Sequence, residues 1–253
     1  MEQEDRERFH SISMANDYNQ MCRLIVQGYD FMQDTLIDIL KFEKIDDIVL
    51  LDLGAGSGIL IEKVLNEFPD SICYYLDYSN DFKAIAQKKL QKFEDGVIYV
   101  QSDFCDEWES EINELPNVIT SSSAIHHLLN KDKKKLYNRC YKLLDKNGWF
   151  FNIDEMKTLN KDAYLKSLYF WIYHAEKLKD NISDDLSNAY VDTMKKFDMW
   201  KKRNVDNIRI PKQEGDDIHE SFLIQLDWLE EIGFKNTDLF CKLFLWSMIG
   251  GKK

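Results

Sequence analysis

The sequence predicts an α/β fold: a doubly wound, mostly parallel sheet of seven strands, with an antiparallel edge strand and a helical cap insertion. Two observations support this prediction. Short apolar runs alternate with helical patterns over residues 46–156, as in parallel strands joined by crossover helices. A glycine-rich turn also follows the first apolar run, at residues 54–58, and such turns let a ligand lie against the bare main chain.

Composition and charge limit the classes of protein to consider. With 253 residues, 44% of them hydrophobic, the chain can bury a sizeable core. A net charge of −12 makes a nucleic-acid partner an unfavoured interpretation. The five cysteines are scattered and show no C-x-x-C spacing, so we expect reduced thiols, and we assign no metal site. The charged N-terminus and the short apolar runs favour a cytoplasmic protein without a signal peptide or membrane span.

The N-terminal segment, residues 1–45, is expected to form a helical cap, because apolar residues over 18–40 have helical spacing with a break near Gly28. The core is expected over residues 46–156. Its first strand is the unbroken apolar run that precedes the glycine turn, and Asn147-Gly148 marks the end of its last helix. The strands are predicted at 48–53, 72–76, 97–101, 118–122 and 149–153, and the helices at 57–68, 81–93 and 131–144.

The pattern changes over residues 157–220. Two helical stretches rich in aromatic residues follow one another there with no strand between them. Such an insertion cannot join a parallel sheet, so we expect it to cap the crevice at the strand ends, where ligands of open α/β sheets bind. Residues 221–253 are expected to return to the core. The last helix is predicted over 216–232, and the closing strands over 239–244 and 245–249.

Four loops at the carboxyl ends of predicted strands carry residues suited to a nucleoside ligand. The glycine loop follows the first strand, and Asp77 follows the second, where a carboxylate can accept both hydroxyls of a ribose. Asp103 and Phe104 follow the third strand and suit an exocyclic amine and a purine face. Residues 121–128 follow the fourth. Each acidic residue alone is equally well explained as a helix cap, but the order of all four loops favours a ligand site.

The order of these motifs resembles that of the class I S-adenosylmethionine-dependent methyltransferases, which implies a Rossmann-like fold and S-adenosyl-L-methionine as cofactor. A dinucleotide fingerprint has its third glycine where Ile59 stands, so a nicotinamide oxidoreductase is disfavoured. The resemblance implies that Asp77 binds the ribose, and that Tyr78 and Asp103 contact the adenine. The cofactor-binding residues that it implies are Tyr29, Gly54, Ala55, Gly56, Gly58, Asp77, Tyr78, Asp103, Phe104 and Ser122.

A closer similarity is to the subgroup that contains the bacterial carboxy-S-adenosylmethionine synthase of wobble-uridine modification. Its N-terminal helix pattern recurs at residues 21–29, which implies that Tyr29 reaches the cofactor. In that enzyme an arginine of the insertion reads the extra carboxylate. The comparable stretch here, residues 190–200, contains Lys195 and Lys196 but no arginine. We therefore expect an ordinary methyl donor.

The expected activity is transfer of a methyl group to an O, N or S nucleophile of a small molecule by in-line displacement. The protein then has to align the nucleophile and exclude water. His126 and His127 are the catalytic candidates, as base or orienting imidazole, and His126 is favoured. Asp154 and Glu155, at the end of the fifth strand, are second candidates, with loop solvation as the alternative. Helix capping and internal packing are the alternatives for both histidines. The expected acceptor-binding residues are Tyr18, Arg23, Asp154, Tyr173 and Trp200.

Two other functions stay open at this point: an RNA-modifying enzyme of the same fold, and a cofactor-binding sensor that transfers nothing. The lysine run at residues 133–135 is interpreted as a solvated helix face rather than a nucleic-acid patch. The oligomeric state is also open, with a homodimer as one alternative.

Overall fold

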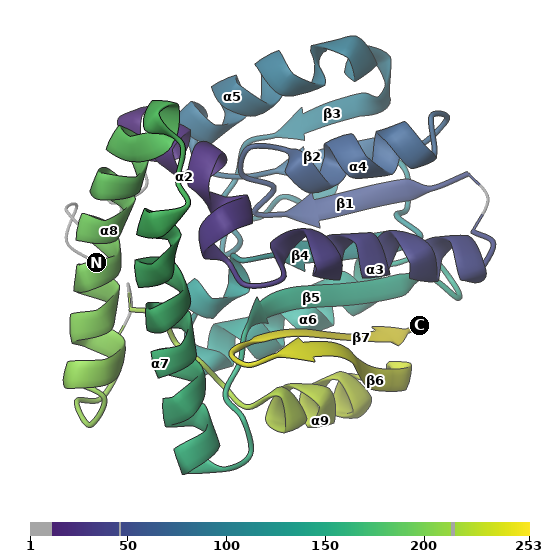
Figure 1. Ribbon diagram of the computed structural model, residues 1–253. Helices are drawn as coiled ribbons and strands as arrows, with labels where there is room; N and C mark the ends of the chain where they lie inside the picture. Colours follow the sequence, from purple (N-terminus) through teal and green to yellow (C-terminus); the bar gives the residue numbers. More distant parts are fainter. Residues whose placement is uncertain (1–11, 46, 214–215) are drawn as a thin grey trace.

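The computed structural model describes residues 12–45, 47–213 and 216–253, so the charged first eight residues lie outside the described part. Within that part, seven strands form one sheet in the order β3-β2-β1-β4-β5-β7-β6 (Figure 1). The first five strands pair in parallel, and β7 runs antiparallel to both β5 and β6. This confirms the predicted fold class, and it refines one detail: the antiparallel strand is second from the edge, and β6 forms the edge.

The five parallel strands begin and end within two residues of their predicted bounds. The largest difference is in β5, which continues two residues further than predicted and so includes Asp154 and Glu155 as buried strand residues. The strands are β1 Val49–Leu53, β2 Ile72–Leu76, β3 Val97–Val100, β4 Val118–Ser122, β5 Trp149–Glu155, β6 Lys235–Leu243 and β7 Trp246–Lys252.

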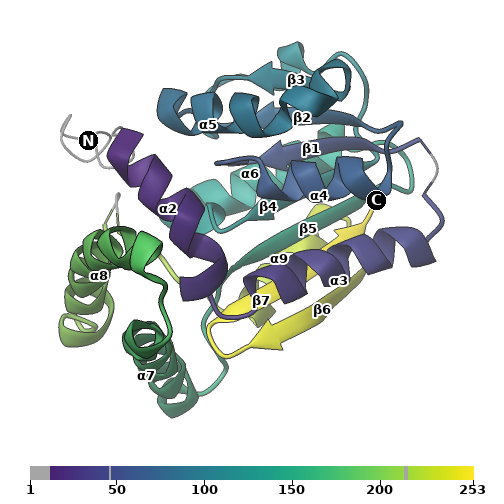
Figure 2. The same cartoon turned by 45° about the horizontal axis from the view of Figure 1, so that its top comes forward.

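Helices cover both faces of the sheet (Figure 2). One face packs against α3, α4 and α5, and the other against α6 and α9. These helices are α3 Tyr29–Phe42, α4 Ile59–Glu67, α5 Asn80–Leu90, α6 Asn130–Leu143 and α9 Phe222–Ile232. Short helical turns complete the connections, at Gln91–Gly96, Glu109–Glu111, Ile125–His127, Leu178–Asp180, Asp184–Leu186 and Lys202–Asp206.

Three further helices stand beyond the carboxyl ends of the parallel strands (Figures 1 and 2). They are α2 Ile12–Ile25, α7 Lys161–Lys177 and α8 Ser187–Lys201. Gly28 separates α2 from α3 with a φ of 71°, a left-handed conformation that glycine adopts without steric cost, so the predicted break occurs there. The three helices therefore lie where the crevice of an open α/β sheet binds its ligands.

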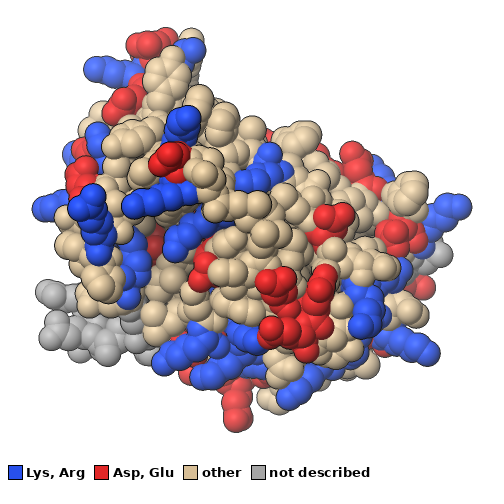
Figure 3. Space-filling view, turned by 90° about the horizontal axis from the view of Figure 1, so that it is seen from below, with Lys and Arg blue, Asp and Glu red and all other residues tan. Residues whose placement is uncertain are grey.

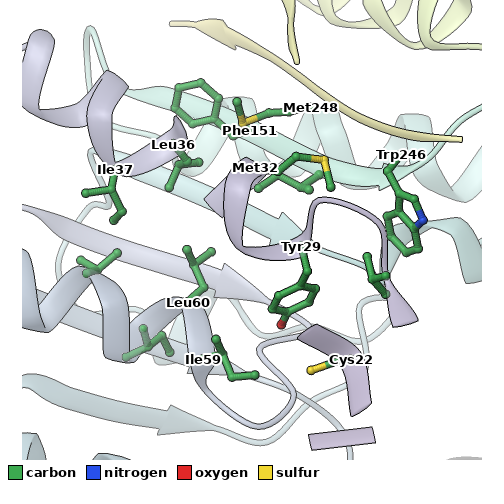
Figure 4. Close-up of a cluster of buried hydrophobic side chains, with 14 of the residues drawn as sticks. Cys22, Tyr29, Met32, Leu36, Ile37, Ile59, Leu60, Phe151, Trp246 and Met248 are labelled. Carbon is green, nitrogen blue, oxygen red and sulfur yellow. The ribbon is translucent and has the colours of Figure 1, made fainter. Parts of the chain in front are cut away.

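The core between the sheet and α3 fixes the approach of α2. Met32 and Leu36 of α3 are fully buried against residues of β5 and β7 (Figure 4). Tyr29, at the start of α3, joins the same cluster, and its ring points toward Cys22 of α2 (Figure 4). Burial of this ring removes apolar surface from water and so stabilises the junction between the two helices.

The helix predicted from residue 216 was wrong over its first six positions, because α9 begins at Phe222. The preceding residues are extended and bond to other loops: Ile218 N donates to His126 O at 2.8 Å, and Lys157 N donates to Glu220 O at 3.0 Å. These long-range main-chain bonds satisfy groups that a helix would have satisfied internally. Ser221 then caps α9 by accepting from Leu223 N at 3.3 Å.

Candidate functional site

The three glycines of the loop after β1 have different surroundings. All have positive φ values, of 69°, 52° and 74° for Gly54, Gly56 and Gly58. A Cβ added to Gly54 would lie 2.5 Å from Ala124 Cβ, and one added to Gly58 would lie 2.9 Å from Leu90 Cδ1. At Gly56 the nearest atom would be a backbone oxygen at 3.9 Å. Gly54 and Gly58 therefore permit close packing, whereas Gly56 leaves bare main chain beside open space.

Asp77 fixes the glycine loop from the end of β2. Its Oδ2 accepts from Gly56 N at 2.9 Å, and its Oδ1 accepts from Ser79 N at 2.8 Å. Tyr75 Oη donates to Gly56 O at 2.7 Å, so both main-chain groups of this glycine are bonded. Burial raises the pKa of Asp77, although the three main-chain donors around it oppose this shift. Each carboxylate oxygen has a second lone pair, which leaves capacity for a further donor.

The loop after β3 lies against the glycine loop. The ring of Phe104 faces Gly54, since a Cβ on that glycine would lie 2.9 Å from Phe104 Cζ. Asp103 Oδ1 accepts from Cys105 N at 2.9 Å, which turns the chain, and burial raises the pKa of the neighbouring Tyr78. Arg139 of α6 holds the loop from the other side by donating to Phe104 O. A cavity of about 550 Å³ beside this loop is lined in part by Phe104 and Arg139.

The end of β4 meets two helices that precede the sheet in the sequence. Ser122 Oγ accepts from Gln33 Nε2 of α3 at 3.4 Å. Gln33 is 1% exposed, and its Oε1 has no hydrogen-bond partner within the described part of the chain. Tyr18 of α2 packs edge-on against Phe82, with the two ring centroids 5.6 Å apart. The hydroxyl of Tyr18 forms a hydrogen bond with the side chain of Ser123. The structure thus brings Tyr18 and Ser122 to one edge of the sheet.

Next to this edge lies a buried group of ionisable side chains from three segments, which we call the histidine–carboxylate cluster. His126 Nδ1 donates to Asp154 Oδ1 at 2.5 Å. The other ring nitrogen of His126 lies 3.9 Å from both Glu155 Oε1 and Asp217 Oδ1. The cluster consists of His126, His127, Asp154, Glu155, Asp217 and His219, and all but His127 are at most 5% exposed.

The cap supplies one wall of this cluster. Tyr164 of α7 hydrogen-bonds through its hydroxyl to His219 Nδ1 at 2.8 Å. The Trp200 ring of α8 lies 6.4 Å from that imidazole. Asn204 Nδ2 donates to Asp217 Oδ2 at 2.9 Å, and Arg203 lies 3.3 Å from the same oxygen. A cavity of about 410 Å³ borders the cluster, and its lining includes Tyr164, Asp217 and His219.

The two adjacent histidines have opposite protonation preferences. Burial disfavours the charged form of His126, but Asp154, Glu155 and Asp217 outweigh burial and raise its pKa to about 9. Burial and the neighbouring His126 lower the pKa of His127 well below its ordinary value. At neutral pH, His126 therefore suits a hydrogen-bond donor and His127 a neutral imidazole. The favoured role of His126 as the base stays a prediction.

Two expected acceptor-binding residues lie apart from the cluster. The guanidinium of Arg23 is 53% exposed and pairs with Asp30, with Nε and Oδ2 2.9 Å apart. Tyr173 is 61% exposed on α7. The other three, Tyr18, Asp154 and Trp200, are placed at or beside the cluster by the contacts given above.

The solvated-face interpretation of residues 133–135 was wrong for Lys133. This side chain is 1% exposed and donates to the carbonyl of Ile218, beside the histidine–carboxylate cluster. Burial lowers its pKa to about 8. Lys134 and Lys135 do remain partly or largely exposed, with 43% and 72% of their side chains accessible.

Sequence reasoning missed the contribution of Asp217 and His219, because it predicted a helix there. A signal was present, since Ile218 is the only apolar residue over 216–221, too few for the apolar face of an amphipathic helix. It also missed Arg203 and Asn204, which follow the stretch of residues 190–200 in which an arginine was sought. No local pattern in the sequence links these residues to His126.

The surface and the helices bear on possible partners. The face shown in Figure 3 carries acidic and basic side chains interspersed rather than one continuous basic surface. Over the described ranges, the helices are all too short or too polar to cross a bilayer.

Comparisons with known proteins agree with this architecture. Residues 51–150 match a family model described as a methyltransferase domain. The chain is 24% identical over 249 residues to carboxy-S-adenosyl-L-methionine synthase 1 of Yersinia pseudotuberculosis, covering 96% of this chain and 93% of that protein.

Two solved structures share the fold. One is a candidate S-adenosyl-L-methionine-dependent methyltransferase from Methanococcus maripaludis, with 18% identity, a TM-score of 0.60, and coverage of 97% of this chain and 94% of that one. The other is human N-acetylserotonin methyltransferase in complex with S-adenosylmethionine, with 14% identity and a TM-score of 0.50. The match covers 81% of this chain but only 47% of the human chain, so our chain spans about half its length.

The sheet order and the glycine loop define a Rossmann-like methyltransferase fold. With the match of residues 51–150 to the family model, they identify this part of the chain as a methyltransferase domain. The domain is that of an enzyme with S-adenosyl-L-methionine as cofactor.

The residues present fit this cofactor. Gly56 offers bare main chain beside open space, and the buried carboxylate of Asp77 lies directly beside that glycine. The unpaired Oε1 of Gln33 lies next to Ser122 at the end of β4 and is an acceptor suited to a buried polar or charged ligand group.

Proposed function

We propose that the chain transfers a methyl group from S-adenosyl-L-methionine to an O, N or S nucleophile of a small molecule. The observation that carries the proposal is the position of the histidine–carboxylate cluster. It joins the last two residues of β5, Asp154 and Glu155, to the histidines that follow β4, and it borders the cavity of about 410 Å³ under the cap. That volume is in the range of small-molecule sites. The bound cofactor supplies an electrophilic methyl group, and the protein supplies alignment and exclusion of water.

In this proposal the cofactor lies along the carboxyl ends of β1 to β4. Asp77 accepts from the ribose hydroxyls, and Tyr78, Asp103 and Phe104 surround the adenine. Gly56 provides the close main-chain approach, with Gly54, Ala55 and Gly58 shaping its loop. Ser122 lines the methionyl end of the cofactor. Tyr29, which is buried at the junction of α2 and α3, contacts the same end.

The acceptor site is proposed between the cluster and the cap. His127 can take a proton from the nucleophile, because its imidazole is neutral at neutral pH. His126, held by Asp154, can orient the acceptor as a hydrogen-bond donor. Tyr18 and Trp200 lie beside the cluster, whereas Arg23 and Tyr173 would take part only after moving from their present surface positions. The cavity is lined by an acidic residue, Asp217, and a basic residue, Lys212. It therefore suits an acceptor that carries both a hydrogen-bond donor or cationic group and an acceptor or anionic group.

We also propose a division of the chain into a cap, residues 1–45 and 157–220, and a core, residues 46–156 and 221–253. Both cap segments contribute side chains beside the strand ends: Tyr18 from the first, and Tyr164 and Trp200 from the second. A mobile or exchangeable cap would then change the acceptor without changing the cofactor site.

The test combines binding with product detection. Calorimetry measures S-adenosyl-L-methionine affinity, and mass spectrometry follows transfer of a deuterated methyl group to a panel of phenols, amines, thiols and carboxylic acids, with tRNA as a separate arm. We expect the label to appear in a small molecule. Methyl transfer should fall more in His127→Ala than in the surface variant His174→Ala. Label confined to tRNA would replace the proposal with RNA modification. Tight binding without transfer in every arm would favour a sensor. Analysis of the donor by mass would reveal a carboxylated cofactor.

A further inference from the structure

The cluster contains an arrangement of donor atoms that methyl transfer does not require. Across the described ranges, His126, His127 and Asp217 offer three potential ligand atoms that all lie within 4.8 Å of one another. His127 Nδ1 and Asp217 Oδ1 are 3.4 Å apart, and His126 Nε2 and Asp217 Oδ1 are 3.9 Å apart. Two ligands of a tetrahedral zinc ion are separated by about 3.4 Å, given bond lengths of about 2.1 Å. Two of the three separations are therefore at or near ligand spacing, and the third is at most 4.8 Å.

From this arrangement we infer a binding site for one divalent transition-metal ion, Zn²⁺ in particular, formed by His126 Nε2, His127 Nδ1 and Asp217 Oδ1. Two imidazoles and one carboxylate are the protein ligands of many zinc sites in which the fourth position is open. Asp217 and the histidines come from different segments, and the bond from Ile218 N to His126 O holds the two segments together.

The surroundings of the ligands are those of a metal centre. His126 Nδ1 donates to Asp154, so a bound metal ion would displace the proton of Nε2, whose lone pair would then face the ion beside Asp217. Asp217 uses its other oxygen, Oδ2, to accept from Asn204 and to contact Arg203, so Oδ1 is left toward the histidines. Outer partners of this kind, present here for His126 and Asp217, are typical of metal sites and are not needed by a helix cap.

A second observation points to a ligand in the same place. Glu155 is 4% exposed and directs Oε1 to within 3.9 Å of His126 Nε2. Its Oε2 and the Nε2 of His219 lie 2.6 Å apart, yet neither atom has a hydrogen bond of acceptable geometry within the described part of the chain. Buried carboxylates and imidazoles are ordinarily paired or bound to a metal. A small rotation of the Glu155 side chain would make it a fourth ligand or a partner of metal-bound water.

Asp217 lines the cavity in which we propose the acceptor, so an ion held by this carboxylate would lie beside that space and could bind a lone pair of the nucleophile. That role rests on the proposed function, but the metal site itself does not. The experiment therefore measures metal directly on the full chain, with no methyl acceptor present.

Purified protein is stripped with a chelator, dialysed against Zn²⁺, and its metal content and affinity are measured by elemental analysis and calorimetry. We expect about one equivalent of Zn²⁺ per chain, and a tetrahedral visible spectrum when Co²⁺ replaces it. Asp154→Asn, which removes an outer partner, should weaken Zn²⁺ binding by about 10–100-fold. Asp217→Asn and His127→Gln remove ligands and should weaken it further. The matched controls Asp216→Asn and His174→Gln, beside and away from the site, should bind as the unaltered protein does.

Circular dichroism identifies any variant that fails to fold, and because two different ligands are replaced, one such failure does not prevent the test. The inference is overturned if the unaltered protein retains no Zn²⁺ beyond the level of Asp217→Asn. It is also overturned if both ligand variants keep full affinity. Metal binding without methyl transfer would leave the site in place and count against the proposed function alone.

Discussion

The different surroundings of Gly54 and Gly56 allow one substitution to separate folding from cofactor binding. Both residues have positive φ, so alanine at either position costs about 1–2 kcal/mol of conformational energy. At Gly54 the new Cβ would also lie 2.5 Å from Ala124 Cβ, and overpacking of this kind costs about a further 1–3 kcal/mol. At Gly56 the nearest atom is 3.9 Å away, so nothing further is lost. Gly54→Ala should therefore destabilise the protein by about 2–5 kcal/mol and Gly56→Ala by about 1–2 kcal/mol.

Binding should show a different pattern from stability. The Cβ of Gly56→Ala would project into the space where the cofactor is proposed to approach the main chain, so this variant should stay folded and lose at least about tenfold in S-adenosyl-L-methionine affinity. Urea unfolding without ligand gives the stabilities, and calorimetry gives the affinities. If Gly56→Ala binds the cofactor as tightly as the unaltered chain, the proposed path of the cofactor is wrong. Equal stability of the two variants would refute the packing argument.

Three further predictions concern other parts of the site. Asp77→Ala should lower S-adenosyl-L-methionine affinity by about 1–3 kcal/mol in calorimetry, whereas Asp77→Asn should lose less, because its Oδ1 can still accept. Burial raises the pKa of Asp52 to about 7, so the native state holds a proton that the unfolded state releases near pH 4, and stability falls as pH rises from about 4 to 7. Asp52→Asn keeps an acceptor for Thr120, so it should melt above the unaltered protein at pH 8, with a gap that closes toward pH 5; parallel melting curves would contradict this. Arg139→Lys keeps the positive charge but loses the guanidinium fork that donates to Glu109 and to the carbonyls of residues 104 and 106. The loop after β3 should therefore become less ordered, and its amides should exchange faster with solvent.

Local patterns in the sequence were sufficient for the parallel strands β1 to β4 and the glycine loop, whereas β6 begins four residues before its predicted start and β7 ends three residues after its predicted end. Strand positions follow from short apolar runs, and the left-handed turns follow from glycine, so β1, β2 and β4 were predicted to within one residue. The end of β5 was missed, because Asp154 and Glu155 are polar and their burial depends on the cap and on β7. A polar residue that is buried by tertiary contacts has no distinct local pattern.

The same reasoning explains why half of the cluster was found and half was not. His126 and Asp154 follow predicted strands, whose carboxyl ends meet at one edge of the sheet, so their proximity could be expected. Asp217 and His219 reach that edge through an extended segment fixed by long-range bonds to His126 and Lys157. Lys133 was likewise assigned to a solvated face, because the helical pattern cannot indicate that this segment covers it.

The cost of the cluster is the strongest physical reason to place function there. Burying Asp154, Glu155 and Asp217 around the imidazole of His126 removes three carboxylates from water, which is unfavourable by several kcal/mol per charge before pairing. The adjoining cap shows that an apolar alternative fits this fold, since Trp171, Phe197 and Trp200 pack as a stacked and edge-on group beside it. A cap needed only for stability would continue that packing. Polar residues held at such cost, and oriented by Asn204 and Tyr164 rather than simply neutralised, are better explained by a bound acceptor or ion.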